Sequence, residues 1–168
     1  ANDLFILSKT IKTIKKRSFG YLFVSYVFFV LIMVLALQSV PQWALLLFIL
    51  ASAYHFGEQQ WHTSQIVNSI KRYLFYVFYG GFLFALLFYT HSSQTIAIVK
   101  DISDLALSFV FLEVLLVIAI ILSLLLLVLN FNNLKSQFLF QFLALLTLII
   151  LFTQTSLLWS FSVYFIVW

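Results

Sequence analysis

The stretch LALSFVFLEVLLVIAIILSLLLLVL, residues 105–129, decides the class of fold. It is an almost unbroken apolar run with one ionisable residue, Glu113, and it exceeds the roughly 20 residues that a helix needs to cross a bilayer. Lipid offers no hydrogen-bond partners to irregular backbone or to an open sheet edge. The run is also far longer than the roughly 10 alternating residues of a membrane β-strand. We therefore expect a transmembrane helix here.

The composition of the whole chain extends this expectation to its other segments. Of 168 residues, 64% are hydrophobic and 8% are charged, whereas soluble domains have roughly 45–50% apolar residues. The chain has no cysteine, so disulfides and thiolate ligands are excluded. The predicted fold class is an all-α integral membrane protein, a multi-pass helical bundle that forms a single transmembrane domain over residues 1–168.

Hydropathy and basic residues predict the spans and their orientation. Five of the nine Lys and Arg residues lie between Lys9 and Arg17, beside an apolar segment, which indicates a membrane surface rather than a nucleic-acid partner. Alternate loops carry eight basic residues on one side of the membrane and only Lys100 on the other. The basic loops are therefore expected in the cytoplasm, and the expected location is a bacterial cell (inner) membrane. The predicted spans are about 19–38, 42–61, 73–91, 105–129, 137–154 and a sixth from about 156.

A polar stripe interrupts the second predicted span, in SAYHFGEQQWH, residues 52–62. His55, Glu58, Gln59 and His62 follow one another at helical spacing and share one face. His55 would lie about 12 residues, roughly 18 Å, from the outer end of the span, in the cytoplasmic half of the bilayer. Ionisable groups inside a span are costly and usually functional. The imidazole is therefore a metal ligand, a proton relay or an interhelical hydrogen-bond donor, and the spacing leaves these three open.

The other ionisable residues in or near the spans are expected to have structural roles or to lie at the membrane interface. Glu113 is expected to make an interhelical hydrogen bond or to act as a counter-ion, and His91, beside two serines, is expected at the membrane interface. His62 would stand roughly 10 Å along the helix from His55, too far to bind the same ion, and is also expected at the interface.

The two ends of the chain are predicted to reach the same depth as His55. Ala1 is not a Met, and Trp168 falls inside an apolar run, so we expect an internal piece of a longer protein, truncated at both ends. Asp3 would lie close to the cytoplasmic end of an earlier helix, in the same layer of the membrane as His55. A metal at His55 would need partners from other helices.

SAYHFGEQQW, residues 52–61, resembles the SxxHFGExDW signature of the Brp/Blh family, the membrane β-carotene 15,15′-dioxygenases. FSVYFIVW, residues 161–168, is similar to the segment that runs directly into WHSxRH in that family, and AND, residues 1–3, resembles the end of an HGAxD motif. The resemblance covers the whole chain in order and hydropathy. Gln60 departs from the pattern, because the family has an aspartate before the tryptophan.

The resemblance implies a dioxygenase that uses O2 to split β-carotene at its central 15,15′ double bond into two retinals. It implies a non-haem iron, Fe(2+), held by histidines inside the bundle, with His55 as a ligand and Glu58 and Asp3 orienting ligand imidazoles. The other ligands are expected outside the chain, so the chain alone is expected to be inactive. The implied partners are lipid-dissolved carotenoid, O2, membrane lipid and a rhodopsin as retinal recipient. The implied substrate-binding residues are Phe56, Trp61, Tyr164, Phe165 and Trp168.

Two other functions compete with this interpretation. One is a non-catalytic membrane protein, such as a transporter subunit or assembly factor, in which His55 and Glu58 form a proton relay or an interhelical hydrogen bond. The other is a different histidine–iron oxygenase that acts on lipid, such as a desaturase or hydroxylase. Those enzymes usually rely on several closely spaced histidine pairs, and this chain has three histidines in all.

Overall fold

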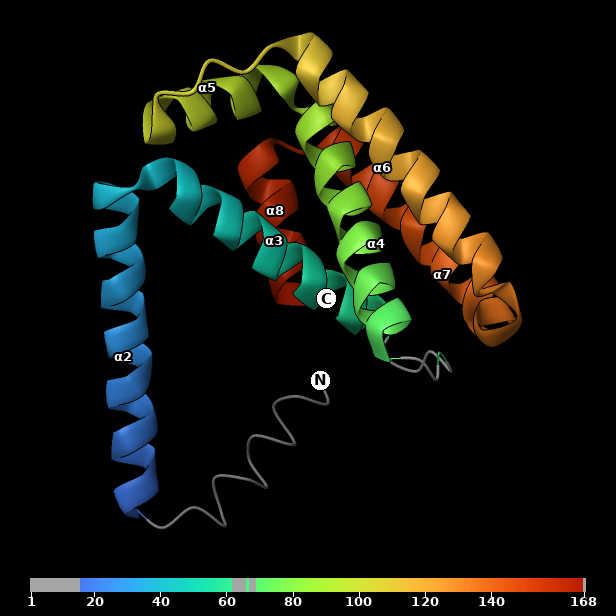
Figure 1. Ribbon diagram of the computed structural model, residues 1–168. Helices are drawn as coiled ribbons and strands as arrows, with labels where there is room; N and C mark the ends of the chain where they lie inside the picture. Colours follow the sequence, from blue (N-terminus) through green and yellow to red (C-terminus); the bar gives the residue numbers. More distant parts are fainter. Residues whose placement is uncertain (1–15, 62–65, 67–68, 168) are drawn as a thin grey trace. The chain divides into compact units, whose positions relative to one another are not determined.

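The computed structural model describes residues 16–61, 66 and 69–167, and the regular structure of these residues is entirely helical (Figure 1). The predicted all-α fold class is confirmed. By length and composition, three of the described helices could cross a membrane: α4, α6 and α7. The helices are α2 (Lys16–Ser39), α3 (Pro41–Gln60), α4 (Ser69–Thr90), α5 (Ser92–Ser103), α6 (Phe109–Leu129), α7 (Phe131–Gln154) and α8 (Leu157–Val167).

The chain divides into two compact units, Ala1–Ala44 and Leu45–Trp168. The described part of the first is α2 with the first turn of α3, and most of the described side chains of α2 are exposed, among them Phe23 and Leu31. The second holds the rest of α3 and α4 to α8, and all the buried contacts described below lie within it.

Residues 92–104, which the sequence predicts as a connection, contain the helix α5. The segment has neither glycine nor proline before Asp104, so nothing in it prevents a helix. The helix ends at Asp104, which adopts a left-handed conformation with φ 56° and whose N–H donates to the Lys100 carbonyl. Aspartate is one of the few non-glycine residues that visits this region readily.

The predicted connection 130–136 is also shorter than expected, because α7 already begins at Phe131. The break between α6 and α7 is confined to Asn130. Its side-chain Nδ2 donates to the Leu126 carbonyl over 2.8 Å, and its own carbonyl accepts from the backbone N–H of Asn133 over 2.9 Å. A single asparagine thus ends one helix and leads into the next.

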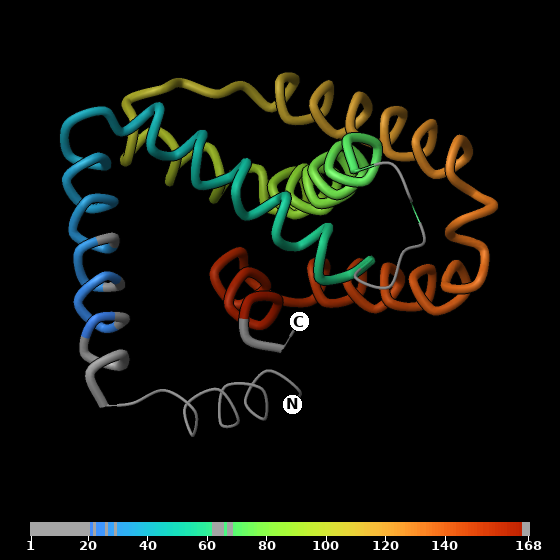
Figure 2. The backbone as a smooth tube through the Cα atoms, turned by 60° about the horizontal axis from the view of Figure 1, so that its bottom comes forward, coloured from blue at the N-terminus to red at the C-terminus, as the bar shows by residue number. Residues whose placement is uncertain are grey.

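Helix α4 is the centre of the second unit, where it contacts α5, α6, α7 and α8 (Figure 2). On α6, the Ser123 Oγ donates to the Phe78 carbonyl of α4 over 3.0 Å. Such a bond joins helices where lipid offers no hydrophobic drive for association.

Two glycines bring the backbones of α3 and α4 into contact. A Cβ atom at Gly57 would overlap the backbone carbonyl of Tyr76, and one at Gly80 would overlap the backbone carbonyl of Ala53. Close approach through small residues is the usual basis of helix packing in membranes. The glycine of the HFGE motif is therefore required by packing, and it fixes the position of the residues on either side of it.

Candidate functional site

His55 lies on α3 with its side chain exposed, while its neighbours Phe56 and Gly57 are buried against the rest of the second unit. The centroid of its ring lies 6.1 Å from that of Phe56. Among the residues that the structure describes, no group of three or more His, Cys, Asp or Glu side chains is placed to hold a metal ion. The assignment of His55 as an iron ligand stays a prediction.

Glu58 is held by a residue of its own helix. The Tyr54 hydroxyl donates to Glu58 Oε1 over 2.9 Å, one turn earlier on α3. The Tyr54 ring in turn lies 5.9 Å from the ring of Tyr73 and 6.1 Å from that of Tyr76, both on α4. Tyr54 is not among the site residues predicted from the sequence, although its i, i+4 spacing from Glu58 indicates that the two side chains can meet.

An aromatic cluster forms next to His55 where α3 meets α8. The ring of Phe56 lies 4.3 Å from that of Tyr164 and 4.5 Å from that of Phe165, centroid to centroid, the second pair edge to face. Phe84 of α4 lies 5.4 Å from Phe56 on another side. The aromatic cluster of Phe56, Phe84, Tyr164 and Phe165 thus brings together three of the predicted substrate-binding residues.

Trp61 packs elsewhere, against α4. Its ring meets those of Phe75 and Tyr79 edge to face, at 5.3 and 5.6 Å, and its side chain is fully buried. The Tyr76 hydroxyl donates to its backbone carbonyl over 3.3 Å. Its surroundings are those of a core residue. The other predicted site residues, Asp3 and Trp168, lie outside the described residues, as does His62.

Gln60 belongs to a buried polar network that joins three helices. Its Nε2 donates to the Tyr79 hydroxyl of α4 over 2.8 Å, and its backbone carbonyl accepts from Gln141 Nε2 of α7. The amide oxygens of Gln60 and Gln141 have no partner among the described residues. A buried polar atom left unpaired costs about 1–3 kcal/mol. The sequence identifies Gln60 as a departure from the family motif, but it gives no signal for Tyr79 or Gln141.

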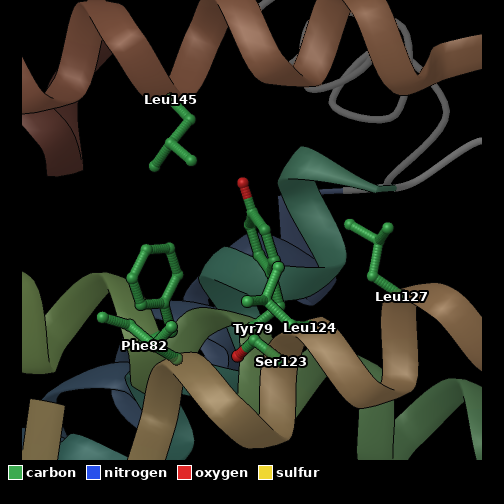
Figure 3. A pocket seen from close by; sticks show the side chains of 7 residues that line it. Tyr79, Phe82, Ser123, Leu124, Leu127 and Leu145 are labelled. Carbon is green, nitrogen blue, oxygen red and sulfur yellow. The ribbon is translucent and has the colours of Figure 1, made fainter. Parts of the chain in front are cut away.

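A cavity of about 120 Å³ lies between α4, α6 and α7 (Figure 3). Tyr79 stands between α6 and α7 with its hydroxyl directed away from α4. The lining is apolar except for two hydroxyl groups. It consists of Tyr79, Phe82, Ile120, Ser123, Leu124, Leu127 and Leu145.

A second polar cluster lies at the ends of α4, α7 and α8. His91 Nε2 lies 3.4 Å from Ser160 Oγ, which is 2.6 Å from Thr155 Oγ1. Gln94 Oε1 accepts from the backbone N–H of Leu157 over 2.9 Å. These bonds join the connection between α4 and α5 to the connection between α7 and α8. Glu113, by contrast, is exposed on α6.

A comparison with known protein families gives a match over the whole chain. The family model described as beta-carotene 15,15'-dioxygenase matches residues 1–168. No curated protein and no solved structure matches the chain.

Proposed function

The chain belongs to the β-carotene 15,15′-dioxygenase family, and we propose that it cleaves β-carotene at the central 15,15′ double bond to give two retinals. In this reaction the C15=C15′ bond and the O–O bond of one O2 molecule both break. Each of the two carbons receives one oxygen atom, so no other oxidant or reductant is needed. The observation that carries the proposal is the family match over residues 1–168.

The aromatic cluster supports this proposal as the place where the polyene binds. Its four rings come from α3, α4 and α8, and it adjoins His55 through the contact with Phe56. Phe56 and Tyr164 are buried, whereas Phe165 is 41% exposed. A carotenoid dissolved in lipid can approach such an edge without crossing water, and aromatic faces pack well against a flat conjugated chain. Trp168 and Trp61 are the remaining predicted substrate-binding residues, although Trp61 packs in the core against Phe75 and Tyr79 rather than in the cluster.

Iron belongs to the proposal as the cofactor, with His55 as one ligand. Imidazole is a good ligand for iron, and bound iron would supply the activation of O2. The described residues contribute a single histidine here and do not form an iron site by themselves. The proposal therefore requires further ligands from outside the described residues. Because the His55 side chain is exposed, its imidazole is open to such groups.

Glu58 and Asp3 complete the proposed site as groups that orient ligand imidazoles. In the structure the Glu58 carboxylate accepts from the Tyr54 hydroxyl through Oε1. This bond restrains a carboxylate on the same helix as His55. A hydrogen bond from a ligand imidazole to such a carboxylate fixes the orientation of the ring. Tyr54 acts in the proposal as the positioning residue for Glu58.

The proposed setting is a bacterial inner membrane with the basic loops in the cytoplasm. Lipid would deliver the carotenoid, and a rhodopsin would receive the retinal. The apolar surfaces of α6 and α7 support contact with lipid, because most of their large apolar side chains are exposed in the structure.

Expression of the complete protein in β-carotene-accumulating bacteria tests the proposal. We expect loss of the carotene colour and formation of retinal, and we expect His55→Ala to abolish both. Leu50→Ala is the matched control on α3, because Leu50 is also exposed but cannot bind a metal. Unchanged carotene with a membrane-inserted protein would refute the proposed activity. Full activity of His55→Ala would refute the role of His55.

A further inference from the structure

The cavity between α4, α6 and α7 lies outside the aromatic cluster and has a ligand chemistry of its own. Its volume is about 120 Å³, and its lining offers only two hydroxyl groups, those of Tyr79 and Ser123 (Figure 3). The Ser123 hydroxyl already donates to the Phe78 carbonyl. The Tyr79 oxygen already accepts from Gln60. A ligand in this cavity therefore meets a nearly apolar surface.

The size and polarity of the cavity select a small apolar molecule. A buried water needs two to four polar partners, and apolar cavities of roughly 150 Å³ stay dry and bind xenon or benzene. A carotenoid with its long polyene chain is far too large. O2 is small and apolar, and it is the second substrate of the proposed reaction.

The cavity opens towards the outer face of α6. Leu124 contributes to the lining and is nevertheless 56% exposed, in a helix whose other large apolar side chains are also mostly exposed. In a bilayer this face meets hydrocarbon, in which O2 dissolves better than in water. O2 can therefore enter the cavity directly from lipid.

Tyr79 connects the cavity to the aromatic cluster. Tyr79 and Tyr164 belong to the same buried core, and the centroid of the Tyr164 ring lies 4.3 Å from that of Phe56. Tyr79 therefore lines the cavity and also belongs to the buried core that contains Phe56, Phe84 and Tyr164.

We propose that this cavity binds O2 drawn from the lipid and holds it beside Tyr79, whose side chain belongs to the same buried core as the proposed carotenoid site. The inference rests on the proposed function, because O2 has a role here only in an oxygenase. It adds a substrate-binding site that is separate from the polyene site and lies on the side of α4 that faces α6 and α7.

Methyl NMR of the complete protein under O2 pressure tests binding without any need for turnover. Dissolved O2 is paramagnetic and accelerates the relaxation of methyl groups that it contacts. We expect a large acceleration at the cavity residue Leu127, at least as large as that at Leu143, which is exposed on α7. Leu148, buried in the core, is the packed reference. A response at Leu127 no greater than that at Leu148 would overturn the inference.

Filling the cavity provides the kinetic test. Leu145→Phe places a ring in the cavity from α7, and Leu143→Phe, two residues away and 53% exposed, is the matched control. We expect Leu145→Phe to abolish the O2 response at Leu127 and to raise the KM for O2 severalfold, with the KM for β-carotene unchanged. The control should change none of these values. Leu127→Phe, observed through the Leu145 methyls, serves as the second filling variant if Leu145→Phe does not fold.

The two tests separate failure of this inference from failure of the proposed function. A parent protein that forms no retinal would defeat the proposed function, and the NMR measurement would still show whether O2 enters the cavity. Retinal formation with an unchanged KM for O2 in a folded, cavity-filled variant would overturn the inference and leave the proposed function standing.

Discussion

Replacing Gly57 by alanine tests the close packing of α3 on α4. The added Cβ would overlap the backbone carbonyl of Tyr76. Helix backbone cannot rotate away as a flexible side chain can, so the two helices must move apart. Overpacking of this kind typically costs about 1–3 kcal/mol. Separation of the helices would also weaken the bond of 2.8 Å from Gln60 to Tyr79, worth about 1 kcal/mol.

Helix propensity acts in the opposite direction. Alanine is favoured over glycine inside a helix by about 1 kcal/mol. This gain offsets the weakened hydrogen bond, and the expected net loss of stability for Gly57→Ala is about 1–3 kcal/mol. Gly81 is the matched control, because a Cβ there meets nothing within 4 Å. Gly81→Ala should therefore be neutral or up to about 1 kcal/mol stabilising.

The free energies of unfolding of both variants can be measured in mixed micelles by denaturant titration, with helical circular dichroism as the signal. We expect Gly57→Ala to unfold at a lower denaturant concentration than the parent protein, whereas Gly81→Ala should not. Equal stability of the two variants would refute the close contact of α3 and α4.

Three further substitutions test other parts of the structure. Tyr79→Phe removes the acceptor of the Gln60 amide and should lower the free energy of unfolding by about 1–3 kcal/mol; a loss no larger than that of Tyr73→Phe, at a residue 49% exposed, would argue against the buried network. Phe56→Ala should cost about 3–5 kcal/mol, since the ring is buried in the aromatic cluster, and a loss below about 1 kcal/mol in the same titration would contradict that packing. Asp104→Gly should raise stability by up to about 1 kcal/mol, because glycine adopts positive φ without strain; a clear decrease would mean that the aspartate side chain stabilises the end of α5.

The helical fold and most of its helices could be predicted from the sequence because the apolar runs are long. The helix predicted over residues 105–129 is present, but it begins at Phe109. The missed elements are short and polar. Helix α5 has too few apolar residues to be predicted as a span, and the α6–α7 junction depends on the hydrogen bonds of a single residue, Asn130.

Only part of the candidate site could be predicted. The motif around His55 and the closing segment with Tyr164 and Phe165 are visible in the sequence, and the structure brings Phe56 into contact with both aromatic residues. The network of Gln60, Tyr79 and Gln141 was not predictable, because it joins positions 19 and 81 residues apart. Which side chains face one another there depends on how each helix is rotated, and nearly uniform apolar helices carry little information about rotation.

Cleavage of β-carotene into two retinals is tested by the stoichiometry of the reaction in the purified complete protein, measured as retinal formed per β-carotene consumed. We expect two retinals for each β-carotene, with one O2 consumed, and no retinal from His55→Ala at equal amounts of folded protein. Other apocarotenals in place of retinal, or undiminished retinal formation by His55→Ala, would contradict it.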